Sequence, residues 1–189
     1  MARIAIFASG SGTNAITIIK NFLNSKNTIV SLYCNNPSAQ VVQKAPLYSV
    51  PVVLFSHSDL YDSDVVHAKL CTDKIDVIVL AGFLWLLPPP IIASFSGRII
   101  NIHPSLLPKY GGKGMYGMNV HNAVIQNREK ESGITIHMVD EKYDNGSILF
   151  QAKCQITPFD TARSLSKKVQ ALEHEHYSPV IAHFLDTLQ

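Results

Sequence analysis

The sequence predicts an α/β protein with a doubly wound, mostly parallel sheet, helices on both faces and a long C-terminal helix. Two observations predict the sheet: short apolar runs alternate with segments of helical spacing, and a glycine-rich loop follows the first apolar run. Such alternation is typical of βαβ units, whose parallel strands are buried on both faces. A third observation, an apolar stripe that follows Asp160, predicts the C-terminal helix.

The first part of the chain supplies the parallel strands. Its apolar runs, rich in valine and isoleucine, cover residues 3–7, 28–33, 52–55, 76–80 and 98–102. Helices are predicted over residues 15–23, 39–47 and 62–70. Before the last run, three consecutive prolines at 88–90 interrupt an uncharged stretch, which argues against a membrane span and predicts a loop and a short helix.

After residue 105 the pattern changes. A glycine-rich loop leads to a helix near residues 120–127, and strands are predicted at 133–139 and 147–156. The last segment should form a long amphipathic helix with Asp160 as N-cap and a kink near Pro179. Its expected apolar stripe comprises Leu165, Val169, Leu172, Val180, Phe184 and Leu188. No repeat or linker is apparent, so we expect one domain over residues 1–189.

Composition narrows the function classes. The chain has 189 residues, a formal net charge of +2 and no long basic block, so we expect no nucleic-acid partner. Three widely spaced cysteines do not form a disulfide framework, and the N-terminal residues do not resemble a signal peptide. We therefore expect a cytoplasmic protein with small-molecule substrates and no membrane partner, either a monomer or a homodimer.

The most informative segment for function runs from Asn101 to Pro108. On an extended backbone, residues two apart project to the same side, so Asn101 and His103 should face one space. An amide can hydrogen-bond a developing oxyanion, and an imidazole can give or take a proton near neutral pH. This pair suits acyl or formyl transfer. The alternative is a histidine that packs or caps at the end of a strand.

The loop of residues 9–15 joins the first strand to the first helix. Its Gly-Ser-Gly-Thr-Asn-Ala spacing fits a dinucleotide fingerprint, but residues 33–37 hold no carboxylate for a ribose, which argues against NAD. Backbone N–H groups at a helix start, with the hydroxyls of Ser11 and Thr13, instead predict a phosphate site. A tight turn that serves only packing is the alternative.

Two carboxylates in the second part of the chain are further candidates. Asp144 precedes the turn pair Asn145-Gly146, so it is either a turn former or a carboxylate that faces His103. In the second case it would raise the pKa of the imidazole, provided that burial does not outweigh it. Glu173 lies at the edge of the apolar stripe, where it lines a cleft or is simply solvated. Its histidine neighbours lack zinc spacing, so no metal is expected.

Together these residues resemble the phosphoribosylglycinamide (glycinamide ribonucleotide) formyltransferases of purine biosynthesis, of the folate-dependent, single-domain type. The resemblance covers essentially the whole chain and rests on residues 9–14, 79–83, 101–110, 140–146 and 151–153. It implies a Rossmann-like formyltransferase fold. It also implies transfer of the formyl group of 10-formyltetrahydrofolate to the amine of glycinamide ribonucleotide, with no metal and no NAD.

The resemblance further implies a catalytic set. Asn101 would hydrogen-bond the formyl oxygen, protonated His103 would act as general acid, and Asp144 would keep the imidazole charged. Residues 1–100 would form the nucleotide-phosphate half of the domain, and residues 101–189 the folate and catalytic half.

Binding residues follow from the same resemblance. The substrate phosphate would be bound by Ser11, Gly12, Thr13 and Asn14, and the ribose hydroxyls by Glu173. The folate would be bound by Leu84, Trp85, Leu86, Leu87, Asn101 and Asp140. Trp85 and His57 stand where many members have arginine, and the loop of residues 111–117 is unusually rich in glycine, so the preference for folate tail length stays open.

Two other functions are compatible with parts of this pattern. A formyltetrahydrofolate deformylase shares the Asn-His-Asp set but gives the formyl group to water. A non-catalytic nucleotide-binding module would have the glycine loop without needing Asn101, His103 and Asp144.

Overall fold

The computed structural model describes residues 1–188 and divides into two compact units, Met1–Ile100 and Asn101–Gln189. Over the described residues, seven strands form one sheet in the order β3-β2-β1-β4-β5-β6-β7. Strand β5 (Ile99–His103) belongs to both units, because the boundary falls within it. The predicted α/β class with a mostly parallel sheet is confirmed.

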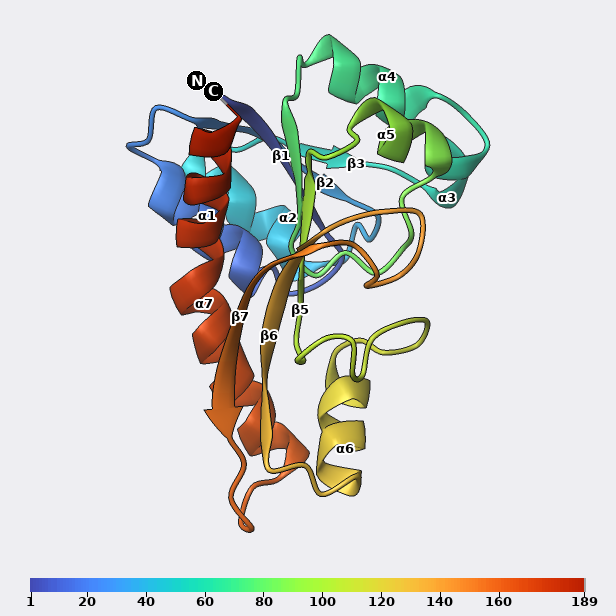
Figure 1. Cartoon of the computed structure of the whole chain (residues 1–189). Coiled ribbons are helices and arrows are strands. Elements are labelled where there is room, and N and C mark those ends of the chain that lie inside the picture. The colour runs from blue at the N-terminus through green and yellow to red at the C-terminus, as the bar shows by residue number, and fades with distance from the viewer. Residues whose placement is uncertain (189) are drawn as a thin grey trace. The chain divides into compact units, whose positions relative to one another are not determined.

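Unit 1 is a parallel α/β layer structure. Its remaining elements are β1 (Arg3–Ala8), α1 (Thr13–Phe22), β2 (Thr28–Cys34), α2 (Gln40–Lys44), the 3-10 helix η1 (Ala45–Tyr48), β3 (Val52–Leu54), α3 (His57–Tyr61), α4 (Val65–Thr72), β4 (Val77–Leu80) and α5 (Pro89–Ser94). Strand β1 pairs in parallel with β2 and β4, and β2 pairs with β3. Helices α1 and α2 lie on one side of these strands, and α4 and α5 lie on the other (Figure 1).

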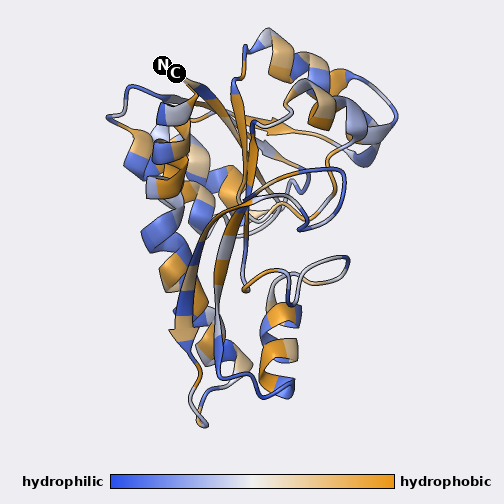
Figure 2. Cartoon of the chain, viewed as in Figure 1, coloured by the Kyte–Doolittle hydropathy of each residue, from blue (hydrophilic) through white to orange (hydrophobic). Residues whose placement is uncertain are grey.

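Burial on both faces explains the composition of the unit 1 strands. Every residue of β4 is buried, as is β1 after its first residue. Both strands are mainly hydrophobic (Figure 2). Because helices cover each face, neither strand needs the alternation of polar and apolar residues that a half-exposed strand shows.

One predicted helix of unit 1 is divided in two, and another is preceded by a short helix that was not predicted. The helix expected over residues 39–47 is α2 followed by η1, because Pro46 lacks the N–H that an α-helix would need there. The segment before the helix expected at 62–70 forms the separate helix α3. Ser56 and Asp59 start α3 with a reciprocal capping box.

Unit 2 combines an antiparallel strand pair with two helices. Its elements, besides the end of β5, are α6 (Met118–Gln126), β6 (Glu131–Met138), β7 (Ile148–Gln155) and α7 (Ala162–Thr187). Strands β6 and β7 pair from Glu131 opposite Gln155 to His137 opposite Ile148. Helix α7 packs against both strands and against α6. No helix within residues 1–188 is long and apolar enough to cross a membrane.

The N-terminus of α7 differs from the prediction. Its N-cap is Thr161, which forms a capping box with Ser164, and not Asp160. The Asp160 carboxylate instead accepts hydrogen bonds from the Ser164 hydroxyl at 2.8 Å and from Lys168 Nζ at 2.6 Å. Asp160 therefore ties the preceding turn to the helix without capping it.

The buried stripe of α7 also differs in its second half. Leu165 and Val169 are buried as expected, but the stripe continues through Tyr177, Ile181 and Leu185. These residues keep the four-residue steps that begin at Leu165, so they remain on one slanted face of the helix. Val180, Phe184 and Leu188 lie one step off that face and are half-buried or exposed, and the helix continues through Pro179.

Candidate active site

The candidate catalytic cluster lies within unit 2, at the C-terminal end of β5. As the two-residue spacing predicts, Asn101 and His103 reach the same cluster, which His137 of β6 and Asp144 complete. The histidines are 4% and 1% exposed respectively, so both imidazoles are almost out of contact with bulk water. In such a site hydrogen bonds and charges act more strongly than they do at the surface.

The ring of His103 has a defined orientation. Its Nε2 lies 2.7 Å from the backbone carbonyl oxygen of Tyr110, and because a carbonyl can only accept, Nε2 carries the hydrogen. Its Nδ1 faces Oδ2 of Asp144 at 3.4 Å. Nδ1 is therefore the ring nitrogen at which a proton can be gained or lost.

Asp144 is held by the backbone of the glycine-rich loop. Its Oδ2 accepts a hydrogen bond from the N–H of Gly112 at 2.9 Å, and its own φ of 53° is left-handed. A Cβ atom at Gly111 would lie 3.2 Å from Cβ of Asp144 and 2.6 Å from Leu107 Cδ2. Glycine at 111 thus lets the loop approach Asp144. The aspartate is both a turn residue and a partner of His103.

Burial and charge act in opposite directions on His103. Burial is the largest influence and lowers the pKa of the His103 imidazole, as does nearby His137, whereas Asp144 and the Tyr110 carbonyl raise it. The expected rise in this pKa was conditional on burial being the smaller effect, and in the structure burial is the larger. Burial also raises the pKa of Asp144, but His137, His103 and the Gly112 amide together lower it below its usual value.

His137 is a site residue that the sequence analysis missed. Its Nδ1 lies 2.8 Å from the carbonyl oxygen of Met138, and its Nε2 lies 3.1 Å from the amide nitrogen of Asn101. The available signal was weak: Thr135 and His137 are polar residues, two apart, that alternate with the apolar residues Ile134, Ile136 and Met138. Such residues are usually satisfied core groups, so the alternation alone would not have identified a site.

Tyr110 was also missed, although it lies within the recognised motif. Its hydroxyl donates to Glu129 Oε1 at 2.9 Å and accepts from Asn127 Nδ2 at 2.9 Å. The segment before it is held by Ser105 Oγ, which donates to the carbonyl of Lys109 at 2.7 Å. These bonds fix the carbonyl that in turn orients His103.

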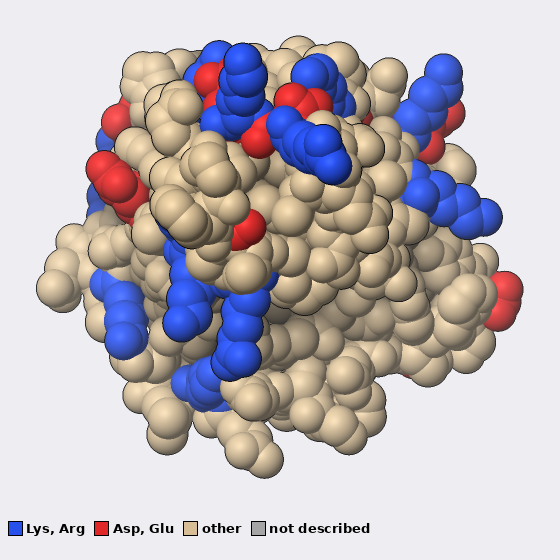
Figure 3. Space-filling model, turned by 90° about the horizontal axis from the view of Figure 1, so that it is seen from below, with Lys and Arg blue, Asp and Glu red and all other residues tan. Residues whose placement is uncertain are grey.

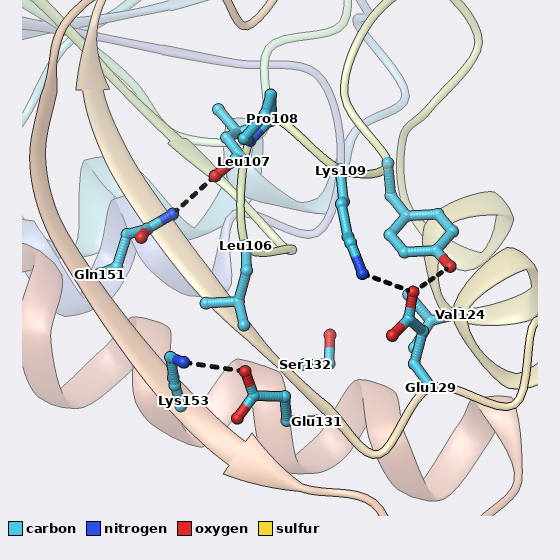
Figure 4. Close-up of a pocket in the computed structure, with 11 residues that line it drawn as sticks. Leu106, Leu107, Pro108, Lys109, Val124, Glu129, Glu131, Ser132, Gln151 and Lys153 are labelled. Carbon is cyan, nitrogen blue, oxygen red and sulfur yellow. Dashed lines mark hydrogen bonds and ion pairs between the residues drawn. The ribbon is translucent and has the colours of Figure 1, made fainter.

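A pocket of about 260 Å³ in unit 2 is lined in part by Tyr110, whose carbonyl contacts His103, but by none of Asn101, His103 or Asp144. Two ion pairs contribute to its lining, Lys109 with Glu129 and Lys153 with Glu131, as Figure 4 shows. Gln151 Nε2 also donates there to the carbonyl of Leu107. The charged groups of this pocket thus largely neutralise one another.

The glycine loop of unit 1 has the geometry of a βα turn at a helix start. Gly12 is the N-cap of α1 with φ 70°, and a Cβ atom there would lie 2.2 Å from Val41 Cγ2. Helix α2 supports the loop, because Val41 N–H donates to the Gly10 carbonyl and Lys44 Nζ donates to the Ser11 carbonyl at 3.0 Å. Thr13 and Asn14 form the first turn of α1. Val41 and Lys44 were not predicted.

The predicted folate segment of residues 84–87 lies in unit 1 and is joined to the glycine loop by Ser9. The Ser9 hydroxyl accepts from the Leu84 N–H at 3.2 Å. The carbonyl of Leu86 accepts from the Tyr61 hydroxyl at 2.7 Å. Leu84 is exposed, Trp85 and Leu86 are half-buried, and Leu87 is buried in the core.

Trp85 belongs to an aromatic cluster. Its ring centroid lies 5.5 Å from that of His57 and 6.2 Å from those of Tyr61 and Phe55. His57 and Trp85, the two residues expected to stand in place of family arginines, are thus neighbours in space. They give this part of unit 1 an aromatic surface.

Two further predicted residues of unit 2 lie outside the cluster of Asn101, His103, His137 and Asp144. Asp140 closes its own loop, because its carboxylate accepts from Lys142 N–H at 2.8 Å and from Asn145 Nδ2 at 2.7 Å. Glu173 is half-buried on α7, and its charge contributes to raising the pKa of the buried Tyr177 hydroxyl, after burial itself.

Charged side chains gather in two places on the face that Figure 3 presents. Several Lys and Arg side chains lie close together at the lower left of this view, and those along its upper edge lie beside Asp or Glu. Within residues 1–188, no group of three or more His, Cys, Asp or Glu side chains is arranged to hold a metal ion.

The fold and the cluster together indicate an α/β enzyme. The amide of Asn101 can stabilise an oxyanion, and the imidazole of His103, beside the carboxylate of Asp144, can transfer a proton. The chain belongs to the formyl transferase family, whose sequence model matches residues 2–181.

Individual relatives agree with this assignment. The chain is 32% identical to the phosphoribosylglycinamide formyltransferase of Bacillus subtilis, covering 98% of this chain and 95% of that protein. A crystal structure of phosphoribosylglycinamide formyltransferase from Bacillus halodurans is 36% identical, with a TM-score of 0.89 over 99% of this chain and 97% of that one.

Other relatives are longer than this chain. It is 36% identical to the chloroplastic phosphoribosylglycinamide formyltransferase of Arabidopsis thaliana, over 95% of this chain and 64% of the relative. It is 40% identical to the chloroplastic enzyme of Vigna unguiculata, of which it spans 59%.

Proposed function

We propose that this chain transfers the formyl group of 10-formyltetrahydrofolate to the amine of glycinamide ribonucleotide, forming formylglycinamide ribonucleotide in purine biosynthesis. The observation that carries the proposal is the cluster at the end of β5. It brings the amide of Asn101, the imidazole of His103 and the carboxylate of Asp144 together in a chain of this family.

The geometry suggests how the proton moves. When the substrate amine attacks the formyl carbon, the carbonyl electrons move onto oxygen, and an N–H of Asn101 stabilises that oxyanion. The attacking nitrogen becomes cationic and loses a proton to Nδ1 of His103, because Nε2 is committed to the Tyr110 carbonyl. Asp144, 3.4 Å from Nδ1, stabilises the imidazolium.

The second step returns the proton. The oxyanion electrons re-form the carbonyl as the bond between the formyl carbon and the folate nitrogen breaks, and Nδ1–H of His103 protonates the leaving nitrogen. The first step needs a neutral ring, which agrees with the lowering of the His103 pKa by burial, and Asp144 then stabilises the charged ring. His103 thus acts first as base and then as acid, whereas the resemblance had implied an initially protonated acid.

Binding roles are assigned to both units. Backbone N–H groups and side chains of Ser11, Gly12, Thr13 and Asn14 would hold the substrate phosphate at the start of α1. Glu173 would accept hydrogen bonds from the ribose hydroxyls. The residues for the folate are Leu84, Trp85, Leu86, Leu87, Asn101 and Asp140. Since the side chain of Leu87 is buried, its contribution would come from backbone groups.

A direct assay tests the function. Purified protein is mixed with 10-formyltetrahydrofolate, with and without glycinamide ribonucleotide, and formation of tetrahydrofolate is followed. The proposal predicts folate product that depends on the ribonucleotide and matches it mole for mole in formylated product. Equal rates without the ribonucleotide would make the protein a deformylase. No turnover in either reaction, with nucleotide binding retained, would leave a binding module.

A further inference from the structure

His137 is placed to control the amide on which the proposed reaction depends. It lies on β6 and is 1% exposed, and each of its ring nitrogens has one polar neighbour within hydrogen-bond distance. Those two neighbours differ in kind: a backbone carbonyl oxygen at Nδ1 and a side-chain amide nitrogen at Nε2. The difference determines where the ring hydrogen is.

The carbonyl of Met138 sets the tautomer. A carbonyl oxygen can only accept, so Nδ1, 2.8 Å away, must carry a hydrogen. The amide nitrogen of Asn101 can only donate, so Nε2, 3.1 Å from it, must offer a lone pair. Both conditions are met by a neutral imidazole with its hydrogen on Nδ1. A charged ring would place an N–H against the amide N–H.

Asp144 is the other polar group that His137 faces. Its Oδ1 lies 3.6 Å from Nε2 and favours a charged ring, but it is beyond hydrogen-bond distance, and Asn101 at 3.1 Å is the closer partner of this nitrogen. We propose that His137 is a positioning residue that holds the Asn101 amide nitrogen through a neutral, Nδ1-protonated imidazole. One N–H of Asn101 is then committed to the ring, and its second N–H has a fixed direction.

A fixed donor direction matters for catalysis. An oxyanion donor is effective when it is already oriented, because the amide then needs no reorganisation as charge develops. Without His137 the side chain of Asn101 could rotate, and its carbonyl oxygen could take the place of its nitrogen. This inference rests on the proposed function for its effect on rate, but the tautomer itself does not depend on activity.

The tautomer can be measured on the unmodified protein. Long-range ¹H–¹⁵N correlation spectra of protein labelled at histidine nitrogens distinguish protonated from unprotonated ring nitrogens. The proposal predicts that His137 at neutral pH shows a protonated Nδ1 and an unprotonated Nε2. A ring protonated on Nε2, whether neutral or charged, would overturn it, even if formyl transfer itself were demonstrated.

Substitutions of His137 then distinguish a role in positioning Asn101 from a role in the stability of the fold. His137→Leu removes the acceptor, and we expect kcat to fall about tenfold, the equivalent of one hydrogen bond, with KM values nearly unchanged. His137→Gln keeps an acceptor oxygen at similar reach and should recover most of the loss. Equal losses in both variants, with melting temperatures like that of the parent protein, would contradict the proposal.

A double-mutant cycle supplies the last control. If His137 acts through Asn101, His137→Leu should change kcat little when Asn101→Ala is already present, whereas independent contributions would multiply. A further full tenfold loss in the Asn101→Ala background would show that His137 acts by another route.

Discussion

At the scale of single residues, the direction of each hydrogen bond determines what each imidazole can do. The Tyr110 carbonyl assigns the hydrogen of His103 to Nε2, and the Met138 carbonyl assigns that of His137 to Nδ1. These two backbone groups therefore leave Nδ1 of His103 for proton transfer and Nε2 of His137 for Asn101. Backbone carbonyls thus define the roles of both imidazoles.

The first prediction concerns Asn101. Asn101→Ala removes the donor to the oxyanion, and we expect kcat to fall by about 10²–10³, the usual scale for such a donor. Folding should survive, because Asn101, in the middle of β5, is only half-buried. Steady-state kinetics together with a thermal unfolding curve would test this. Turnover near the parent value in a folded variant would remove Asn101 from the catalytic set.

The second prediction concerns the pKa of His103. Asp144 raises this pKa against the effect of burial, so Asp144→Asn should lower it further. Less of the ring would then be protonated at any given pH near neutrality, and the imidazolium of the reaction would lose its partner. An NMR titration of His103 in both proteins measures the change directly. Identical pKa values would mean that the two side chains are not coupled.

At the scale of elements, the glycine loop shows how backbone conformation shapes a site. Gly12 begins α1 with a left-handed φ, and Val41 of α2 packs where a Cβ atom would lie. Gly82 also has a positive φ, 77°, but a Cβ atom there would meet nothing within 4 Å. Substitution of Gly82 therefore measures the free-energy cost of the left-handed backbone alone, whereas substitution of Gly12 adds the cost of a steric clash.

The third prediction uses this pair. Gly82→Ala should cost about 1–2 kcal/mol of unfolding free energy, the price of the left-handed conformation alone. Gly12→Ala adds overpacking against Val41, so we expect it to cost about 1–3 kcal/mol more. Denaturant unfolding measures both variants. Equal losses would mean that α2 yields to the new methyl group, and would weaken the view that it holds the loop rigidly.

Several element boundaries were readable from local chemistry, and others were not. The strands of unit 1 were predicted closely, because continuous apolar runs identify them. Pro46, which ends α2, and the Ser56–Asp59 pair, which starts α3, are local signals that the prediction did not include. The buried residues in the second half of α7 could not be predicted. Several apolar residues there are adjacent in sequence, and only packing determines which of them are buried.

At the scale of the whole molecule, site residues that are close in sequence could be paired by prediction, whereas residues far apart in sequence could not. Asn101 and His103 could be paired because two residues on one strand share a face. Asp144 could be suspected but not placed, since a loop more than thirty-five residues away reaches His103 only through tertiary structure. His137 was missed because a buried polar residue in a strand gives no local sign of what it contacts.

Isotopic labelling follows the formyl group to its destination, the amine of glycinamide ribonucleotide in the proposed reaction. The protein is incubated with 10-formyltetrahydrofolate labelled with ¹³C in the formyl group and with glycinamide ribonucleotide, and the products are identified by ¹³C NMR and mass spectrometry. The account predicts that the label appears as a formamide on the glycinamide nitrogen, in step with tetrahydrofolate. Label found as free formate, or retained on the folate while the ribonucleotide stays unchanged, would contradict it.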